Sequence, residues 1–254
     1  MSILLDARDV TKRYGLFTAL DGVSLRVSDG EFVSIIGPNG AGKTTLINVL
    51  SGLAPPTSGR VSFRGHDIVA AGPVALGRLG LARSFQLVNV FPALTVGETI
   101  AVAVTARLRR GRRFWSPLSG DRAIARIVDD VAGVFGLADR LTRPARTLPQ
   151  GDKKLLDVAS AFALGPELIL LDEPTSGVST ADKHAIMEVL VDAAQRLGIK
   201  AIVQVEHDMD IVFGYSQRIV ALHQGRVLAD TTPDGIQRDA EVVATVLGKP
   251  RPSC

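Results

Sequence analysis

Residues 31–51, EFVSIIGPNGAGKTTLINVLS, constrain the fold of this chain more than any other stretch. An apolar run over 32–36 leads into a glycine-rich loop, and apolar residues then recur at helical spacing over 46–50. This order of strand, loop and helix fits the phosphate-loop pattern G-x-x-x-x-G-K-[ST] in full. A glycine-rich turn that only caps a helix would not need the whole pattern. The sequence therefore predicts an α/β fold in which this loop holds nucleotide phosphates.

The loop residues suit a triphosphate, which needs many hydrogen-bond donors in a small space. Glycines keep the backbone N–H groups bare and permit positive φ, and the helix that follows aims its dipole at the phosphates. Lys43 supplies a charge for the β- and γ-phosphates, and the Thr44 hydroxyl is a ligand for Mg²⁺. The predicted nucleotide-binding residues of the loop are Gly37, Pro38, Asn39, Gly40, Ala41, Gly42, Lys43, Thr44 and Thr45.

Composition narrows the class of protein. The net charge is only +3, and five arginines lie within 107–113. The excess positive charge is therefore concentrated in one segment and does not form a general basic surface, which predicts no nucleic-acid partner. No run of about 18 uncharged apolar residues occurs, which predicts no membrane-spanning helix. The start, MSILLDARDV, lacks the basic beginning of a signal peptide. The only cysteine is Cys254, so no disulfide can form within the chain, which suits a reducing compartment.

The pattern of apolar residues divides the chain into an α/β part and a helical part. Short alternating runs over 1–36 predict antiparallel strands that lead into the strand of the phosphate loop. Helical spacing over 94–164 predicts a mainly helical subdomain inserted into the α/β core. Further strands are expected at 61–63, 82–86, 168–171, 201–205, 218–222 and 226–229, and a final helix at about 239–247.

Two apolar strands end in polar residues that suit catalysis. The run over 168–171 is typical of a parallel strand covered on both faces, and it ends in Asp172 and Glu173. Open α/β sheets bind ligands at this edge. Asp172 would hold Mg²⁺ and Glu173 would polarise the attacking water, whereas the alternative is an ordinary surface pair. His207 follows the strand 201–205 at the same kind of edge, which favours a catalytic role over a structural one.

Three other features have two interpretations each from the residues alone. Tyr14 could stack on a nucleotide base or be a partly exposed turn residue. Gln86, at the end of an expected strand, is by itself an ordinary solvated side chain. The arginines of 107–113, followed by Phe114 and Trp115, form either a solvated loop or a contact with anionic lipid or a partner.

These motifs together resemble the nucleotide-binding subunit of an ABC transporter over nearly the whole chain. The family's motifs occur in its order and at its spacing. They are the phosphate loop at 37–45, the glutamine loop at Gln86, the signature at 148–152, the acidic strand end at 168–173 and the switch histidine His207.

The resemblance implies roles for the matched residues, with ATP and Mg²⁺ as cofactors. The implied catalytic residues are Lys43, Gln86, Glu173 and His207, and the implied Mg²⁺ ligands are Thr44, Gln86 and Asp172. Tyr14 becomes the adenine-stacking residue. Gln150 and Gly151, in the signature, would contact the nucleotide held by a second ATPase subunit.

The resemblance also implies an architecture and partners. The chain would be a single ABC ATPase domain over 1–254, a P-loop NTPase with an N-terminal antiparallel β subdomain and an inserted helical subdomain. Its parts would be the core (1–86 and 165–235), the helical subdomain (87–164), and a C-terminal helix and tail (236–254). The partners would be transmembrane permease subunits, a second ATPase subunit and, indirectly, a solute-binding protein. The location would be peripheral, at the cytoplasmic face of the inner (plasma) membrane.

Within the family, the chain most resembles the ATPases of importers for branched-chain and other hydrophobic amino acids. The stretches that carry this are Ser84-Phe85-Gln86 followed by Phe91 and Leu94-Thr95-Val96, the extra segment at 104–121 and the tail at 225–248. Related ATPases serve urea, amide and organic-acid uptake or lipid export. A soluble ABC ATPase is a further alternative, whereas a small-molecule P-loop kinase would not need the signature or His207.

Two positions depart from the family pattern. The signature L-S-G-G-Q reads Leu-Pro-Gln-Gly-Asp here, so Pro149 removes the serine hydroxyl that would contact the partner's γ-phosphate. Ser179 stands where the family often has Asp. The first departure leads to the hypothesis of a heterodimer with unequal sites, in which the site on this chain's own phosphate loop is the faster one.

Overall fold

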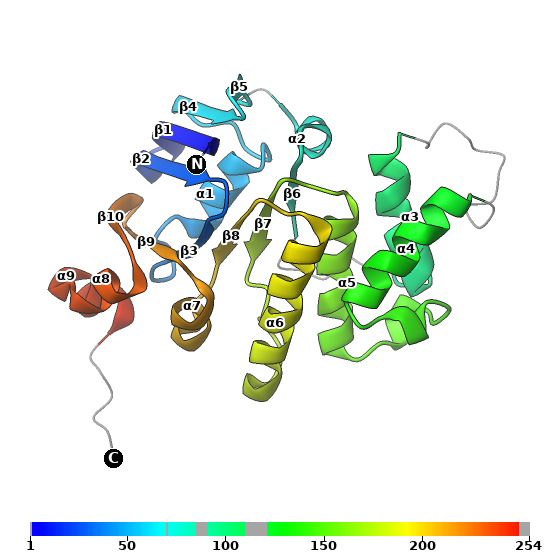
Figure 1. Cartoon of the computed structure of the whole chain (residues 1–254). Helices are drawn as coiled ribbons and strands as arrows, with labels where there is room; N and C mark the ends of the chain where they lie inside the picture. Colours follow the sequence, from blue (N-terminus) through cyan, green and yellow to red (C-terminus); the bar gives the residue numbers. More distant parts are fainter. Residues whose placement is uncertain (1, 70, 85–90, 110–120, 249–254) are drawn as a thin grey trace, which may run out of the picture. The chain divides into compact units, whose positions relative to one another are not determined.

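The computed structural model describes residues 2–69, 71–84, 91–109 and 121–248. Its elements form two compact units (Figure 1). The first unit comprises Met1–Leu76, Leu170–Glu173 and Lys200–Cys254, and the second comprises Gly77–Ile169 and Pro174–Ile199. None of the helices in these described ranges is long and apolar enough to cross a membrane.

The first unit contains a small antiparallel sheet near the N-terminus. Its strand order is β2-β1-β4-β5, with β1 (Ile3–Tyr14), β2 (Phe17–Ser28), β4 (Ser58–Phe63) and β5 (His66–Asp67). Leu5 and Ala7, which alternate along β1, pair with Phe63 and Val61 of β4. All four residues are buried. The antiparallel expectation is confirmed, although β4 begins at Ser58, before the strand expected at 61–63.

A larger, buried sheet carries the phosphate loop. In the first unit its strands follow the order β10-β9-β3-β8-β7. These are β3 (Phe32–Ile36), β7 (Leu168–Asp172), β8 (Ala201–Val205), β9 (Arg218–His223) and β10 (Arg226–Thr231). Strand β3 runs parallel to both β8 and β9. Every residue of β3, β7 and β8 is buried, as expected for strands covered on both faces.

Short helices complete the first unit. They are α1 (Lys43–Leu50), α7 (Met209–Tyr215), α8 (Pro233–Arg238), α9 (Ala240–Val242) and a π-helical turn (Val243–Leu247). Helices α7, α8 and α9 bury Val212, Ile236 and Val242 against Ile36 and Ile219 of the large sheet. The final helix is confirmed in position. Helix α8 was not predicted, although Thr232 caps it and Pro233 begins it.

The second unit is mainly helical, and it includes residues 174–199, which were expected to belong to the core. Its long helices are α3 (Val96–Arg107), α4 (Arg122–Val134), α5 (Gln150–Ala163) and α6 (Thr180–Leu197). Phe135, after α4, packs edge-to-face on Phe162 of α5 with ring centroids 5.2 Å apart. Short β6 (Leu81–Arg83) pairs with the beginning of β7. Helix α2 (Pro73–Leu79), in an Ala- and Gly-rich stretch, was not predicted.

Candidate nucleotide-binding site

The phosphate loop joins β3 to α1 within the first unit. Gly37, Gly40 and Gly42 all have positive φ, at 152°, 82° and 104°. A Cβ at Gly37 would lie 2.3 Å from the Leu222 carbonyl oxygen, and one at Gly42 would lie 2.7 Å from the Ala19 carbonyl oxygen. Only glycine therefore fits at these two positions, and the loop backbone stays free of side chains there.

Lys43 is the first residue of α1 and turns back over the loop. Its Nζ donates hydrogen bonds to the carbonyl oxygens of Gly37 and Pro38, at 2.6 Å and 3.1 Å. Partial burial lowers the pKa of Lys43 from its ordinary value, while the charges of Glu173 and Asp172 oppose this shift. The structure thus brings the predicted lysine within electrostatic reach of the predicted acidic pair.

The acidic pair lies where β7 ends. Asp172 is the last residue of the strand and is buried, whereas Glu173 is partly exposed. Glu173 has a φ of 50°, and its backbone N–H donates to the Val205 carbonyl oxygen at 2.9 Å. A left-handed conformation is unfavourable for a residue with a Cβ, and such strain often occurs at functional sites.

His207 follows β8 and lies beside this pair. Its Nδ1 is 3.8 Å from Glu173 Oε1 and 4.0 Å from Glu206 Oε2, and its imidazole is exposed. The His207 backbone N–H donates to the same Glu206 oxygen at 3.1 Å. The sequence did not single out Glu206, whose side chain is fully buried. The signal was present, because a charged residue directly follows a strand that is apolar except for Gln204.

Tyr14 ends β1 and pairs with Phe17 across a tight hairpin. It is therefore a strand-end residue and not a turn residue. The Lys12 ammonium lies 5.0 Å from the centre of the Tyr14 ring, a cation–π contact that covers one face. Tyr14 is 50% exposed, so the ring remains accessible to a stacking partner.

The signature opens helix α5 in the second unit. Pro149 occupies the N-cap, and it offers no side-chain hydrogen bond to the helix. Gln150 is exposed and Gly151 partly exposed. Asp152, in the first turn, pairs with Arg140 Nη1 at 3.0 Å. The signature helix thus begins without a capping hydroxyl, and its first acidic residue is already paired with an arginine.

Ser179, the second departure from the family pattern, caps helix α6. Its hydroxyl donates to Asp182 Oδ2 at 2.6 Å and accepts from the Asp182 backbone N–H at 3.3 Å. Serine is a favoured N-cap residue, and the paired carboxylate sits at the positive end of the helix dipole. The departure therefore has a local structural role.

Some predicted positions lie outside the described residues. These include Gln86 and most of the arginine-rich stretch with Phe114 and Trp115, so their roles stay predictions. Arg107 is described, as the last residue of α3. Its guanidinium lies close to Gly165, and the residue is exposed.

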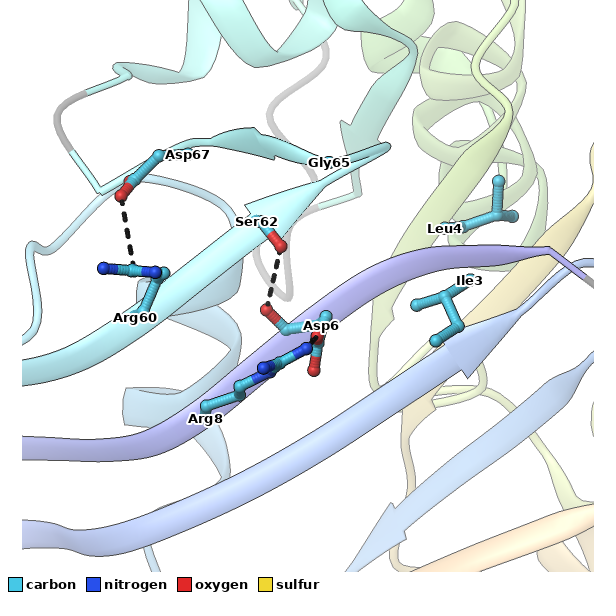
Figure 2. A pocket seen from close by; sticks show the side chains of 8 residues that line it. All are labelled: Ile3, Leu4, Asp6, Arg8, Arg60, Ser62, Gly65 and Asp67. Carbon is cyan, nitrogen blue, oxygen red and sulfur yellow. Dashed lines mark hydrogen bonds and ion pairs between the residues drawn. The ribbon is translucent and has the colours of Figure 1, made fainter.

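A pocket of about 440 Å³ lies on the outer side of the small sheet (Figure 2). All its lining residues come from β1, β4, β5 and the turn between the last two. The Arg8 Nε donates to Asp6 Oδ2 at 2.8 Å, and Arg60 Nε lies 4.0 Å from Asp67 Oδ2. The hydrogen bond from Arg8 lowers the pKa of Asp6. The arginines and aspartates that line this pocket pair with one another. The pocket is therefore an ion-paired surface, and it is separate from the phosphate loop.

Comparisons with known proteins were made for the whole chain. A family model described as "ABC transporter" matches residues 20–176. The high-affinity branched-chain amino acid transport ATP-binding protein LivG of Salmonella typhimurium is 34% identical over 253 residues, which cover 97% of this chain and 98% of that protein. The corresponding protein BraF of Pseudomonas aeruginosa is 31% identical over 251 residues, with 97% and 98% covered.

Solved structures with the same fold were also found. An ATP-binding cassette of an ABC transporter in its ADP conformation has a TM-score of 0.83 at 29% identity, with 96% of this chain and 98% of that one covered. A nucleotide-free cassette gives 0.82 at 28% identity, covering 95% and 97%. A dimeric post-hydrolysis cassette bound to ADP and Pi gives 0.76 at 26% identity, covering 91% and 99%. The predicted α/β fold with its β and helical parts is confirmed.

Proposed function

Because the chain belongs to the ABC transporter family, we propose that it is the ATP-hydrolysing subunit of an importer for branched-chain amino acids or related small polar or organic solutes. Near full-length similarity to proteins named for branched-chain amino acid transport supports the substrate class most strongly. The electrostatic coupling of Lys43 to Asp172 and Glu173 supports ATP hydrolysis at this phosphate loop.

ATP binding would start from the present arrangement of the loop. Lys43 now donates to two loop carbonyls, and it would exchange them for β- and γ-phosphate oxygens. The phosphate charges favour the protonated ammonium, so binding would raise the pKa of Lys43. Backbone N–H groups of 37–45 and the start of α1 would hold the remaining oxygens. Tyr14 would stack on the adenine by the ring surface that Lys12 leaves accessible.

The residues near the loop fit Mg²⁺ as a partner of ATP. Within the described ranges, no three His, Cys, Asp or Glu side chains form a metal-binding cluster. Mg²⁺ does not need one, since it is commonly held by one or two carboxylates together with substrate phosphates. Asp172 and the Thr44 hydroxyl, with Gln86, would supply the protein ligands. A bound Mg²⁺ would neutralise phosphate charge.

Hydrolysis would depend on Glu173 and His207. Glu173 would accept a proton from the water that attacks the γ-phosphate, because its carboxylate is partly exposed beside buried Asp172. His207 lies 3.8 Å from that carboxylate and would contact the γ-phosphate end of ATP. Gln86 would help to orient the water. Lys43 would stabilise the charge that develops on the phosphate oxygens.

The partner subunit would face the signature of this chain. Gln150 and Gly151 would lie against the nucleotide bound by that partner, and the N-terminus of α5 would aim its dipole at the phosphates. Pro149 supplies no hydroxyl there. We therefore propose a heterodimer in which the site on this chain's phosphate loop is the faster one, provided that the partner has a serine in its signature.

The location that follows is peripheral, at the cytoplasmic face of the inner membrane, with the chain bound to permease subunits. The solute-binding protein would act on the same permease from the other side. The segment 104–121 is a candidate contact with the permease or with anionic lipid, because its arginines precede Phe114 and Trp115.

Co-purification tests this proposal directly. The tagged full-length chain would be isolated from its native membranes in mild detergent and its companions identified. We expect two permease subunits and a second ATPase subunit, with ATP hydrolysis that rises when solute and binding protein are added. A chain that is fully active alone in the soluble fraction would support the soluble ABC ATPase instead. Phosphate transfer to a metabolite without phosphate release would indicate a kinase.

A further inference from the structure

A buried hydrogen-bonded network lies in the large sheet behind the candidate site. It consists of Ser34, Gln204 and Ser216, of which the first two are fully buried and the third is 8% exposed. Gln204 Nε2 donates to Ser34 Oγ at 2.8 Å. The hydroxyl oxygens of Ser34 and Ser216 are 2.5 Å apart, which places Ser34 at the centre of the network.

The network joins the segments on both sides of His207 to the strand of the phosphate loop. Ser34 lies in β3, which leads into that loop, and Gln204 lies in β8, which leads into His207. The two are direct partners in the parallel register of β3 and β8. Ser216 is the C-cap of α7, the helix that begins just after His207. His207 is therefore bracketed by two segments that both bond to Ser34.

Further hydrogen bonds hold α7 at its two ends. At its C-terminal end, the Gln217 backbone N–H donates to the Phe32 carbonyl at 3.0 Å, and the Phe32 backbone N–H donates to Gln217 Oε1 at 3.1 Å. At its N-terminal end, Asp208 Oδ1 accepts from the Asp210 backbone N–H at 3.1 Å. The helix after His207 is thus tied to β3 by backbone as well as by side chains.

Stability alone does not explain polar side chains here. Replacing both partners of a buried hydrogen bond by apolar groups of the same shape is often nearly neutral. A buried polar network instead favours one arrangement, although Gln204 Oε1 has no hydrogen-bond partner among the described residues. If β8 slipped by one residue against β3, Gln204 would leave Ser34 and the side chains after the strand would turn to the opposite face.

We infer that Ser34 is a positioning residue for ATP hydrolysis, and that through Gln204 and Ser216 it fixes His207 relative to the phosphate loop. The inference rests on the proposed function, in which His207 contacts the γ-phosphate. In the proposed function the phosphates are held by the loop and α1, and neither of the two side-chain hydrogen bonds of Ser34 reaches these residues. Loss of the network should therefore affect the hydrolysis rate more than ATP affinity.

The test compares Ser34→Ala and Gln204→Leu with the parent in the reconstituted complex. We expect kcat to fall roughly 10-fold, because small displacements of reacting groups have large effects on rate. ATP affinity should remain within about 2-fold, since the phosphate loop keeps its contacts. Ile236→Val is the matched control, because Ile236 is buried against the same sheet face without joining the network. It should lower the melting temperature and leave kcat unchanged.

Two further comparisons separate positioning from general destabilisation. Ser216→Thr keeps the hydroxyl and should retain the parent kcat, whereas Ser216→Ala should behave like Ser34→Ala. In a His207→Ala background, Ser34→Ala should cause no further loss of kcat. An equal loss in both backgrounds, or an unchanged kcat in Ser34→Ala and Ser216→Ala, would overturn the inference. Failure of the proposed function looks different: the parent complex would not hydrolyse ATP, or His207→Ala would keep the parent rate.

Discussion

Glu173 combines a proposed catalytic role with a strained backbone. It is the residue proposed to accept the proton of the attacking water, and its backbone has a φ of 50°. The hydrogen bond from its N–H to the Val205 carbonyl holds this conformation between β7 and β8. Glu173 is partly exposed, whereas Asp172 is buried at the same edge of the sheet.

Strain at Glu173 should be measurable in the nucleotide-free chain. Glu173→Gly should be more stable than Glu173→Gln by about 0.5–1 kcal/mol, because the left-handed conformation costs an L-residue about 1–2 kcal/mol and the flexibility of glycine offsets part of this. Urea denaturation compares the two variants. Glu173→Asn should lie between them, since asparagine tolerates this conformation. Equal stability of all three would contradict the presence of strain.

The pKa of Lys43 leads to a prediction about stability. Burial lowers this pKa, so between the folded value and the ordinary lysine value the unfolded chain binds more protons than the folded chain. The free energy of unfolding therefore rises with pH between these two pKa values. At pH values below both, the charged ammonium of Lys43 opposes folding. Nucleotide-free Lys43→Met should be at least as stable as the parent at pH 7. The stabilisation that ATP gives the parent should be lost.

Thermal melts with and without ATP check both parts of the Lys43 prediction. A clear drop in the melting temperature of nucleotide-free Lys43→Met would contradict the first part. It would mean that the hydrogen bonds of Lys43 to the Gly37 and Pro38 carbonyls outweigh the cost of burying its charge. A normal ATP-induced rise in that variant would contradict the proposed phosphate contact.

Tyr14 should contribute to affinity and not to chemistry. Tyr14→Ala should weaken ATP binding by about 1–3 kcal/mol, the usual range for a base stacked on an aromatic ring. Tyr14→Phe and Tyr14→Trp should bind ATP nearly as well as the parent. Calorimetric titration of the three variants gives the dissociation constants, and equal affinity in all of them would leave Tyr14 with a structural role only.

Among the elements, helix α5 carries the signature that would face the nucleotide bound by the partner subunit. Its N-cap, Pro149, has the extended backbone of a cap but no side-chain acceptor. Helix α6, by contrast, begins with Ser179, which bonds to Asp182 in both directions. Of the two departures from the family pattern, Ser179 therefore supplies a capping hydroxyl, whereas Pro149 supplies none.

Restoring the hydroxyl tests the idea of unequal sites. In a complex that carries Glu173→Gln, the remaining hydrolysis comes from the partner's site, which uses this chain's signature. Adding Pro149→Ser should raise that residual rate roughly 10-fold, because hydrogen bonds to charged groups contribute about 1.5–3 kcal/mol. The stability of the chain should change little, as the new cap offsets the lost rigidity of proline. An unchanged residual rate would argue against the proposed role of Pro149.

At the scale of the whole molecule, the sequence predicted the parts whose structure depends on residues that are close together in the chain. The strand, loop and helix around Lys43 follow from glycine geometry and apolar periodicity, and the buried strands β7 and β8 follow from runs of mainly apolar residues. Helices α2 and α8 were missed because they are short and contain Gly and Pro, which normally indicate turns.

The network around Ser34 was beyond prediction for a different reason. Its three residues come from three separate stretches, and each is unremarkable in its own stretch. Only the parallel register of β3 and β8 and the packing of α7 bring them together. The backbone of Glu173 was equally unpredictable, since glutamate rarely adopts positive φ.

The central claim is that this chain hydrolyses ATP with Glu173 as the base. The most direct measurement is the ATPase rate of the purified transporter complex with Glu173→Gln in this chain, together with its retention of ATP. The account predicts normal ATP binding and a rate that falls on the order of 10²–10⁴-fold, because the proton acceptor is lost while Asp172 remains. Near-normal turnover in that complex would contradict it.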